Sequence, residues 1–258
     1  MRHHVVGLGR WGTWLARRLA GRRRPLQSVA NRTEERARGL ARELGVEHRP
    51  WANLADGLGA ADVVWLCVGD DGLPVLHDRL ADVALRLVIQ ASGTAALPVA
   101  AYPVATAWPL QSISAQREPD WARLTCVVEV AGGADTGAVR GVVERCIGPG
   151  ALLAASAEER ALLHLAAVMT QNFTNHLWRL VAERVGLNRL PHLVPLAEAH
   201  LRDLAGGASP ADLQTGPAAR GDATTLARHL DLLAGYPEAT EVYERMSAQI
   251  AGRIEARR

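Results

Sequence analysis

Three glycines close to the start of the chain have the spacing of a dinucleotide-binding loop. An apolar run ending in Val6 leads into Gly7, Gly9 and Gly12, a G-x-G-x-x-G pattern, and an amphipathic segment covers residues 11–19. In such loops the first glycine makes a tight turn, the second lets backbone N–H groups reach a pyrophosphate, and the third lets the helix lie close to the sheet. Glycine makes up 24 of the 258 residues, so an ordinary strand-to-helix turn is the alternative. The strand before the pattern and the helix after it favour pyrophosphate binding at a helix N-terminus.

A second candidate site follows the next predicted strand, residues 26–30. In NAD-binding folds an acidic residue about 20 positions after the glycines binds the ribose 2′-hydroxyl. This chain has Asn31, Arg32 and Thr33 after that strand. Arg32 can pair with a 2′-phosphate, and Thr33 can cap the following helix while offering its hydroxyl and N–H to the phosphate. The turn therefore favours NADP over NAD; the alternative is a helix cap beside an exposed arginine.

The ends of two further strands complete the candidate cofactor site. The unalternating apolar run 62–68 is typical of a buried parallel strand and leads into Gly69, and a strand over 87–90 ends in the small-residue turn 91–94. Asp70 and Asp71 are expected to cap a helix over 73–80, with paired-carboxylate chemistry as the alternative. The predicted cofactor-binding residues are Gly7, Leu8, Gly9, Arg10, Trp11, Gly12, Asn31, Arg32, Thr33, Val68, Gly69, Asp70, Ser92 and Gly93.

The most informative polar pattern lies on a long predicted helix, residues 157–185. At about 100° per residue, His164, Gln171 and Asn175 form a narrow stripe, with Asn172 beside it and apolar residues around it. Polar groups on an apolar helix need hydrogen-bonding partners. The stripe either packs against polar backbone or a partner subunit, or lines a substrate pocket.

The composition limits the available chemistry. All 29 basic residues are arginine, so a lysine general acid or Schiff base is excluded, and arginine does not release its proton near neutral pH. Three widely spaced cysteines in apolar surroundings indicate buried thiols rather than a disulfide framework or a metal site. A net charge of +2 gives no expectation of nucleic-acid binding. The absence of a membrane-spanning run or a signal peptide predicts a cytoplasmic protein.

The elements that must position these residues change in type after the Gly-Pro-Gly sequence at 148–150. Strands alternate with helices before it, and only helical patterns follow it. The sequence therefore predicts an α/β Rossmann-like domain over 1–150, with a mostly parallel, doubly wound sheet, and an all-α domain over 151–258. The remaining predicted elements are a short helix over 51–58, a loop over 106–112, a strand over 124–130 and helices over 34–44, 134–146, 191–204, 222–233 and 237–256.

Several motifs, taken in order, resemble one bacterial family. They are the glycine loop, the Asp70 turn, Ser92-Gly93, Pro109-Leu110-Gln111, His164-Leu165-Ala166-Ala167 followed by Asn172, and the T-G-P-A-A-R-G-D run at 215–222. The chain resembles a bacterial group of predicted oxidoreductases with a Rossmann-like N-terminal domain and a helical C-terminal domain of unknown function. At longer range it is similar to pyrroline-5-carboxylate reductase, ketopantoate reductase and the 6-phosphogluconate dehydrogenase superfamily. The resemblance covers almost the whole chain, and the T-G-P-x-x-R-G-D run is its most specific part.

The resemblance implies NADP-dependent reduction of a C=N or C=O bond in a pocket between the domains of a homodimer. Relatives often have histidine where this chain has Gln90 and Trp108, so a catalytic histidine at either place would be missing. Related enzymes use a lysine on the first long helix as proton source, and His164 is the best titratable group that remains here. The expected catalytic residues include His164, which either donates the proton, only orients the substrate, or is a satisfied core histidine. The others are Asn172, Asn175 and Gln111 as hydrogen-bonding partners of a small substrate, and Arg220 as partner of a substrate carboxylate or of Asp222.

Other hypotheses stay open. The chain could be an NADP-binding sensor or a degenerate paralogue without turnover, or could use a reduced deazaflavin. An iminium accepts hydride without an added acid, so the lack of lysine favours C=N or another activated substrate. Because the first long helix is apolar on more than one face, we expect a homodimer through the helical domain, with Leu165, Val168, Met169 and Leu177 near the interface.

Overall fold

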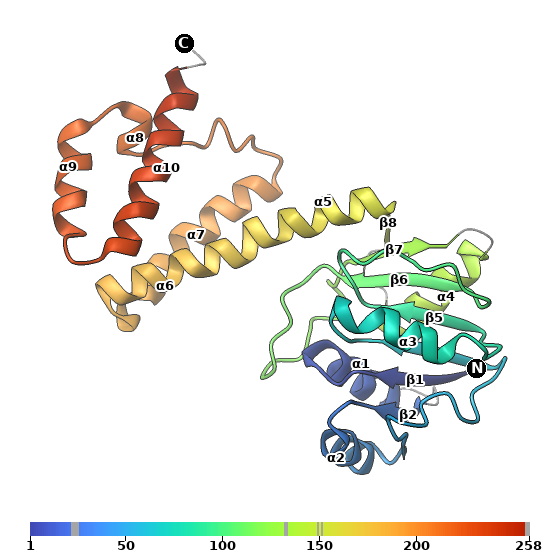
Figure 1. Ribbon diagram of the computed structural model, residues 1–258. Helices are drawn as coiled ribbons and strands as arrows, with labels where there is room; N and C mark the ends of the chain where they lie inside the picture. Colours follow the sequence, from blue (N-terminus) through green and yellow to red (C-terminus); the bar gives the residue numbers. More distant parts are fainter. Residues whose placement is uncertain (22–25, 132–133, 149, 151, 256–258) are drawn as a thin grey trace. The chain divides into compact units, whose positions relative to one another are not determined.

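The computed structural model describes residues 1–21, 26–131, 134–148, 150 and 152–255 (Figure 1). Contacts within the chain divide it into two compact units, Met1–Gln171 and Asn172–Arg258. The predicted ranges, 1–150 and 151–258, differ from this division. The reason is that the first unit also holds the last strand of the sheet and the helix that follows it.

An eight-stranded sheet forms the centre of the first unit (Figure 1). Its order is β3-β2-β1-β4-β5-β6-β7-β8, and every neighbouring pair is parallel except β6 and β7. The mostly parallel, doubly wound sheet predicted from the sequence is confirmed. The order runs outward in both directions from β1 and β4, so a ligand crevice is expected at the carboxyl ends of these strands. The strands are β1 (Arg2–Val6), β2 (Leu26–Ala30), β3 (Glu47–His48), β4 (Asp62–Leu66), β5 (Leu87–Gln90), β6 (Val104–Pro109), β7 (Cys126–Val130) and β8 (Leu152–Ala154).

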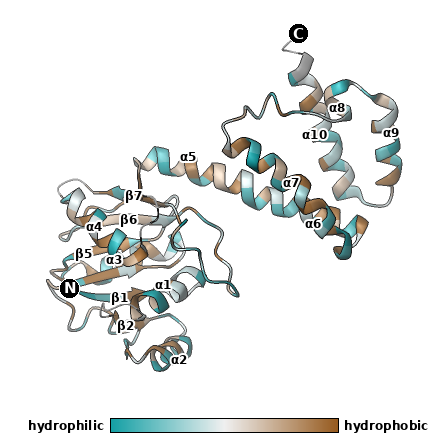
Figure 2. Ribbon diagram, turned by 180° about the vertical axis from the view of Figure 1, so that it is seen from behind, coloured by the Kyte–Doolittle hydropathy of each residue, from teal (hydrophilic) through white to brown (hydrophobic). Residues whose placement is uncertain are grey.

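Helices cover both faces of this sheet because its strands are apolar on both sides, and the central strands are mainly hydrophobic (Figure 2). On one face, α1 (Arg10–Ala20), α2 (Glu34–Leu44) and α4 (Thr136–Ile147) contribute residues such as Leu15 and Val143 to one buried cluster. On the other, α3 (Leu73–Leu80) contributes Leu76 to a second cluster. The two layers fix the directions in which the strand ends point.

Two predicted elements of this unit are wrong. Residues 51–58 form successive turns instead of a helix, with N–H groups that donate to carbonyls three residues earlier, as from Asn53 to Pro50. Gly57 has φ +71°, a backbone conformation that does not continue a helix. The predicted loop 106–112 instead begins within β6, in which Pro109 is the last residue and pairs with Cys126 of β7.

The predicted helix 157–185 is interrupted. It consists of α5 (Ala157–Ala167), a π turn (Val168–Asn172) and α6 (Phe173–Val185), and the boundary between the units falls inside the π turn. The second unit is helical, as predicted. Besides α6 it contains a 3₁₀ turn (Leu187–Arg189), α7 (Leu190–Ala205), α8 (Pro217–Arg220), α9 (Ala223–Leu232) and α10 (Pro237–Glu255), and residue 256 of the predicted last helix lies outside the described residues.

Across the described residues, no helix has both the length and the apolar character needed to cross a membrane.

Candidate active site

The glycine loop joins β1 to α1 with the geometry that its spacing predicts. Gly7 has φ +91°, which favours glycine, and a Cβ on Gly12 would clash with the Gly7 carbonyl oxygen. Gly9 is different, because no protein atom lies within 4 Å of the Cβ that another residue would add there. Gly9 is also the N-cap of α1 and supplies no side-chain cap. The loop therefore presents backbone N–H groups at a helix N-terminus with open space in front of Gly9, which suits a bound phosphate.

A cleft of about 620 Å³ opens beside this loop, at the carboxyl ends of β1, β2 and β4. Eight predicted cofactor residues line it: Gly7, Leu8, Gly9, Asn31, Arg32, Thr33, Val68 and Gly69. Six further residues, which were not predicted to bind the cofactor, also line it: Trp51, Cys67, Asp71, Gly72, Val75 and Leu76. Trp51 follows the two-residue strand β3, and recognising that strand would have placed its ring at this edge.

Asn31 holds the loop in place. Its Oδ1 accepts a hydrogen bond from the Leu8 N–H at 2.9 Å, and its Nδ2 donates to the Thr33 carbonyl at 3.2 Å. The side chain thus joins the end of β2 to the glycine loop of β1. Its contribution to the cleft is to fix two backbone turns.

Arg32 and Thr33 have groups available at the rim of the cleft. Both side chains are exposed, and no hydrogen bond or ion pair of the Arg32 guanidinium occurs among the described residues. Thr33 is the N-cap residue of α2, but its side chain makes no capping hydrogen bond, so the predicted cap is wrong in that respect. A free guanidinium and a free hydroxyl beside a helix N-terminus can bind a phosphate monoester.

Asp70 connects two strand ends instead of capping a helix. A 3₁₀ turn, Asp70–Gly72, precedes α3, and neither this turn nor α3 has a side-chain cap, so the predicted capping by Asp70 and Asp71 is wrong. Asp70 Oδ2 accepts a hydrogen bond of 2.5 Å from the Thr94 hydroxyl. This bond ties the turn after β4 to the turn after β5.

The side chain of Ser92 is buried and stabilises the turn after β5. Its Oγ accepts hydrogen bonds from the Thr94 N–H at 3.1 Å and the Ala95 N–H at 2.8 Å. Gly93 lies at the tip of this turn, and a Cβ there would overlap Cδ2 of His164 and come within 2.9 Å of its Cγ. A titratable ring, that of His164, therefore lies directly against Gly93, one of the two residues predicted to approach a nicotinamide.

His164 contacts two strand ends of the first unit. Besides its contact with Gly93, its ring centroid lies 5.3 Å from that of Trp108, near the end of β6, with an interplanar angle of 52°. The side chain is partly exposed, and its ring nitrogens make no hydrogen bond among the described residues. The His164 ring therefore packs against Gly93 and Trp108, and its ring nitrogens have no hydrogen-bonding partner among the described residues.

Gln90 belongs to a buried polar chain and does not reach the cleft. Its Nε2 donates to the carbonyls of Ala95 and Ala96, and its Oε1 lies 3.1 Å from Nε2 of His77. The His77 ring continues to the hydroxyl of Tyr102 at 3.1 Å. Gln90 is fully buried, so position 90 supports the turn after β5 in this chain, whichever role a histidine has there in relatives.

The remaining loop residues divide between core and surface. Arg10 is exposed at the first position of α1. The Trp11 ring is buried against Trp121 at a centroid distance of 5.6 Å, so a cofactor could contact Trp11 only through its backbone. Gln111 is exposed just after β6.

The predicted polar stripe assumes a regular helix, and the π turn removes that regularity. Gln171 and Asn172 lie within the turn, so 100° per residue does not describe the step from His164 to them. Asn172 and Asn175 belong to the second unit and are exposed. The roles assigned to them stay predictions.

The T-G-P-A-A-R-G-D run forms α8 and the start of α9 in the second unit. Asp222 is the N-cap of α9, and its carboxylate accepts hydrogen bonds from the N–H and hydroxyl of Thr225. The backbone N–H of Thr225 lowers the pKa of Asp222, and its hydroxyl and the charge of Arg220 act in the same direction. No ion pair within 4.0 Å joins Arg220 to Asp222 among the described residues. The exposed Arg220 guanidinium remains available for an anion.

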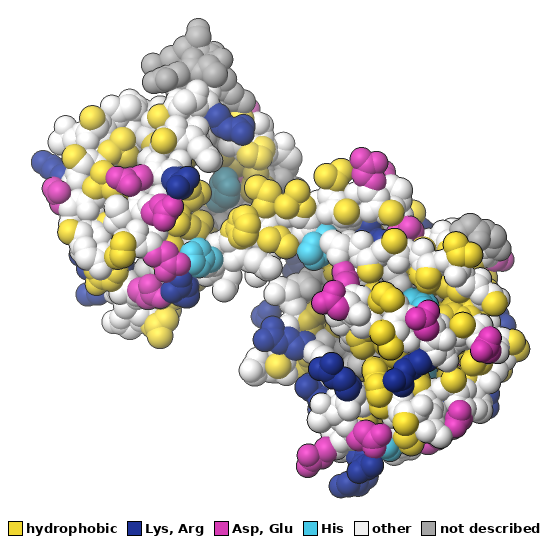
Figure 3. Space-filling view, viewed as in Figure 1, with side chains coloured by type: hydrophobic (Ala, Val, Ile, Leu, Met, Phe, Trp, Pro, Cys, Tyr) yellow, Lys and Arg dark blue, Asp and Glu magenta, His cyan; other side chains and the backbone are white. Residues whose placement is uncertain are grey.

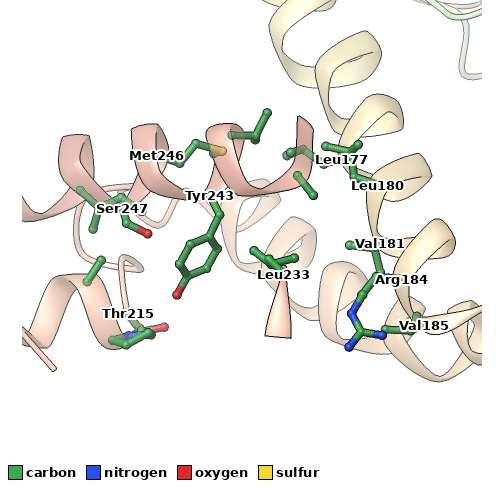
Figure 4. Close-up of a pocket in the computed structure, with 16 residues that line it drawn as sticks. Leu177, Leu180, Val181, Arg184, Val185, Thr215, Leu233, Tyr243, Met246 and Ser247 are labelled. Atoms are coloured by element: carbon green, nitrogen blue, oxygen red, sulfur yellow. The ribbon is translucent and has the colours of Figure 1, made fainter. Parts of the chain in front are cut away.

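The second unit has an apolar pocket of its own, about 460 Å³ in volume (Figure 4). Leu177, Val181 and Arg184 line it from α6, and Tyr243 and Met246 line it from α10. Thr215, Gly216, Pro217 and Ala218 of the T-G-P run form another part of its wall. The Tyr243 hydroxyl is 2.7 Å from Nδ1 of His229.

Comparison with family models gives one match in each half of the chain. Residues 1–87 match the model described as shikimate/quinate 5-dehydrogenase, and residues 126–250 match the model described as domain of unknown function DUF2520. A glutamyl-tRNA reductase from Roseiflexus sp. (strain RS-1) is 42% identical over 57 residues, which are 22% of this chain and 13% of that protein. The chain thus resembles only a segment of this relative.

Solved structures match over the whole chain. A "putative NADP oxidoreductase" from Bacteroides fragilis is 27% identical, with a TM-score of 0.81 over 97% of this chain and 98% of that one. An imine reductase from Myxococcus stipitatus, solved with NADP+, is 18% identical, with a TM-score of 0.65 over 99% and 95% of the chains. A 1-pyrroline-5-carboxylate reductase from Streptococcus pyogenes is 13% identical, with a TM-score of 0.63 over 98% and 98%. The last two share the fold, and together the matches confirm the resemblance inferred from the motifs.

Proposed function

We propose that this chain, in which a Rossmann-like domain precedes a DUF2520 domain, is an NADP-dependent oxidoreductase that reduces a C=N or C=O bond of a small metabolite. The observation that carries the proposal is the cleft at the carboxyl ends of β1, β2 and β4. The glycine loop lines it, as do Arg32 and Thr33, whose side chains make no hydrogen bond among the described residues. The name of the Bacteroides fragilis protein and the NADP+ bound to the Myxococcus stipitatus imine reductase support the choice of cofactor.

The residues that would hold NADP form three groups, and the first two include residues that line the cleft. The backbone N–H groups at Gly9 and the start of α1 would hold the pyrophosphate. Arg32 and Thr33 would hold the 2′-phosphate by charge-assisted hydrogen bonds. The turn at Ser92 and Gly93 would lie at the nicotinamide end. NADPH, when bound, supplies a hydride; the chain binds, orients and provides a proton.

His164 is the residue proposed to hold that proton. It is the titratable ring in contact with Gly93, and its ring nitrogens are free of protein partners among the described residues. If the substrate is a ketone or a neutral imine, the imidazolium would donate a proton to the atom that gains negative charge. If the substrate is already an iminium, His164 would only orient it. Because the chain has no lysine, a C=N substrate is favoured.

The second unit is proposed to contribute substrate contacts and a dimer interface. Asn172 and Asn175 would hydrogen-bond the substrate, as Gln111 of the first unit would, and Arg220 would pair with a carboxylate if the substrate has one. A homodimer is proposed because this unit has little core of its own. Its buried apolar side chains, among the described residues, are those of Leu180 and Ala218.

Cofactor binding and turnover can be tested on the purified protein. NADPH and NADH are titrated by calorimetry, and NADPH consumption is followed by absorbance with a panel of cyclic imines and 2-oxo acids. We expect tighter binding of NADPH than of NADH, and turnover with at least one imine. His164→Ala should lower the rate about 10²- to 10⁴-fold if His164 donates the proton.

The alternatives give different results. If His164 only orients an iminium, the alanine variant should lose no more than about tenfold, a small part of what general acid catalysis contributes. NADPH binding without oxidation across the panel would favour a sensor or a degenerate paralogue. A failure to bind NADPH would refute the proposed function.

A further inference from the structure

We infer that Arg160 is a positioning residue of the proposed active site: it fixes the turn 92–95 to α5 and thereby holds the His164 ring against Gly93. The inference rests on the proposed function for its kinetic part. Its structural part concerns the first unit alone and can be tested in the absence of turnover.

The Arg160 guanidinium is completely buried. Removing its charge from water is unfavourable, so its hydrogen bonds must offset that free energy, and they also determine which parts of the fold it joins. Nε and Nη2 donate to Oε2 of Glu129 on β7, at 3.0 and 2.8 Å. Nη1 donates to the carbonyl of Ser92 at 3.1 Å, and Nη2 also donates to the carbonyl of Ala95 at 2.7 Å. One side chain of α5 therefore joins β7 to both ends of the turn that follows β5.

The same turn is also held by hydrogen bonds of Gln90 and Ser92. Gln90 Nε2 donates to the carbonyls of Ala95 and Ala96, and the Ser92 hydroxyl oxygen accepts from the Thr94 and Ala95 N–H groups. The Ala95 carbonyl accepts from both Arg160 and Gln90. These bonds hold the residues on both sides of Gly93.

His164 follows Arg160 by four residues in α5, so both side chains lie on the same face of the helix. Arg160 binds the ends of the turn, and one helical turn further on, about 5.4 Å along the axis, His164 packs on its tip at Gly93. The ring contacts Gly93 and Trp108 without a hydrogen bond of its own among the described residues. The hydrogen bonds that fix the position of the His164 ring are therefore those of Arg160 to the turn.

An ion pair that only stabilises the fold is the competing explanation, and Arg2 provides a control for loss of an ion pair, with a side chain that is 46% exposed where that of Arg160 is fully buried. Arg2 also pairs with a buried carboxylate of the first unit, through Nε to Asp62 Oδ1 at 2.6 Å and Nη2 to Asp62 Oδ2 at 2.8 Å. It lies at the start of β1, whereas the cleft opens where β1 ends. Arg→Lys at either site keeps the charge but removes the planar set of donors.

The first experiment compares Arg160→Lys and Arg2→Lys by proton NMR of the His164 ring, assigned with His164→Gln. In the wild type the ring protons should be shifted by the ring current of Trp108. Arg160→Lys should lose that shift, and Arg2→Lys should keep it. An unchanged His164 signal in Arg160→Lys would overturn the inference, whether or not the protein turns over any substrate.

The second experiment is a double-mutant cycle on the best substrate found. Arg160→Lys should lower kcat about 10- to 100-fold at saturating NADPH, as expected for a displaced catalytic group. In the His164→Ala background the same change should cost less than about twofold, because residues that act through one another are not additive. Equal losses in both backgrounds would show a structural ion pair instead.

If Arg160→Lys does not fold, Glu129→Gln replaces it in both experiments. It keeps an oxygen acceptor for Arg160 and removes the charge, and the same His164 shift and non-additive loss are expected at smaller size. An absence of turnover in every variant, the wild type included, would count against the proposed function and leave the NMR result to decide the role of Arg160.

Discussion

Gly9 and Gly93 lack a side chain for different reasons. Nothing in the protein occupies the space in front of Gly9, so its backbone is open to the approach of a ligand. At Gly93 the space is filled by the His164 ring, so the protein itself requires glycine. In the proposed function Gly9 serves pyrophosphate binding, whereas Gly93 lies at the nicotinamide end and also leaves room for the His164 ring.

Gly93→Ala should therefore separate binding from catalysis. The added Cβ overlaps His164 Cδ2 and must displace the ring. We expect kcat to fall by about 10- to 100-fold, as for other displacements of about 1 Å, and by a larger factor than NADPH affinity. Gly9→Ala is the contrasting variant, because its Cβ meets no protein atom and should weaken NADPH binding. Equal effects of Gly93→Ala on kcat and on affinity would contradict this division.

Arg32→Ala tests the recognition of the 2′-phosphate. Loss of a charge-assisted pair costs about 1.5–3 kcal/mol, so NADP affinity should fall about ten- to a hundredfold while NAD affinity barely changes. The control is Arg36→Ala, which removes another exposed arginine from the neighbouring helix α2. Titration calorimetry with both cofactors gives the answer, and equal weakening of NADP and NAD would exclude Arg32 from reading the phosphate.

Among the elements, α3 and β5 are joined by a buried polar chain that responds to pH. It runs from Tyr102 through His77 of α3 to Gln90 of β5. Burial lowers the pKa of His77, although its hydrogen bond to Gln90 acts in the opposite direction, and burial raises the pKa of Tyr102 to about 12. The chain that supports the active-site turn is therefore intact with a neutral His77.

The free energy of unfolding should fall as the medium is acidified below the ordinary histidine pKa of about 6.5. The folded-state pKa of His77 is lowered, so the unfolded chain binds more protons in this range, and stability rises with pH. The loss should level off once the pKa of the folded state is passed. Urea denaturation at a series of pH values measures it.

His77→Gln should be less stable at neutral pH and should have a smaller slope of stability against pH. Burial also lowers the pKa of His4, so some slope should remain in that variant. A slope identical to that of the wild type would show that His77 does not titrate as its surroundings imply.

At the scale of the whole molecule, apolar side chains lie exposed on the long helices (Figure 3). Leu165 and Met169 are each 54% exposed and Phe173 is 55% exposed. Helix α7 likewise has no buried residue. Two of the four predicted interface residues are therefore exposed, and the other two, Val168 and Leu177, are half-buried. Exposed apolar surface of this kind marks an interface, and a second copy of the chain is the proposed partner.

Sedimentation equilibrium at micromolar concentration should find a dimer, and Met169→Glu should shift it toward the monomer by placing a charge in the proposed interface. Val99→Glu is the control, because Val99 is fully exposed on a loop of the first unit. The dimer proposal fails if the wild type is monomeric. If Met169→Glu and Val99→Glu behave alike, the interface does not lie at Met169.

Local patterns in the sequence were sufficient for several elements of the first unit. The ranges of β2, α2, α3 and β5 agree with those predicted. Apolar periodicity, glycine spacing and turn residues act within a few positions of the chain, so they can be interpreted without knowledge of the fold. The glycine loop and the Asn31–Thr33 turn were identified in this way.

Tertiary structure alone decided which side chains meet. The strands β3 and β8 have two and three residues and exist only through pairing with β2 and β7. Asn31 is bonded to a loop formed earlier in the chain, Arg160 reaches across from α5 to β7 and the turn after β5, and His164 lies on Gly93. Such partners are far apart in sequence, and the free energy of each contact depends on a geometry that no short window contains. The sequence determined which residues could do the chemistry, and the packing of α5 on the sheet decided that His164 and Arg160 share one turn.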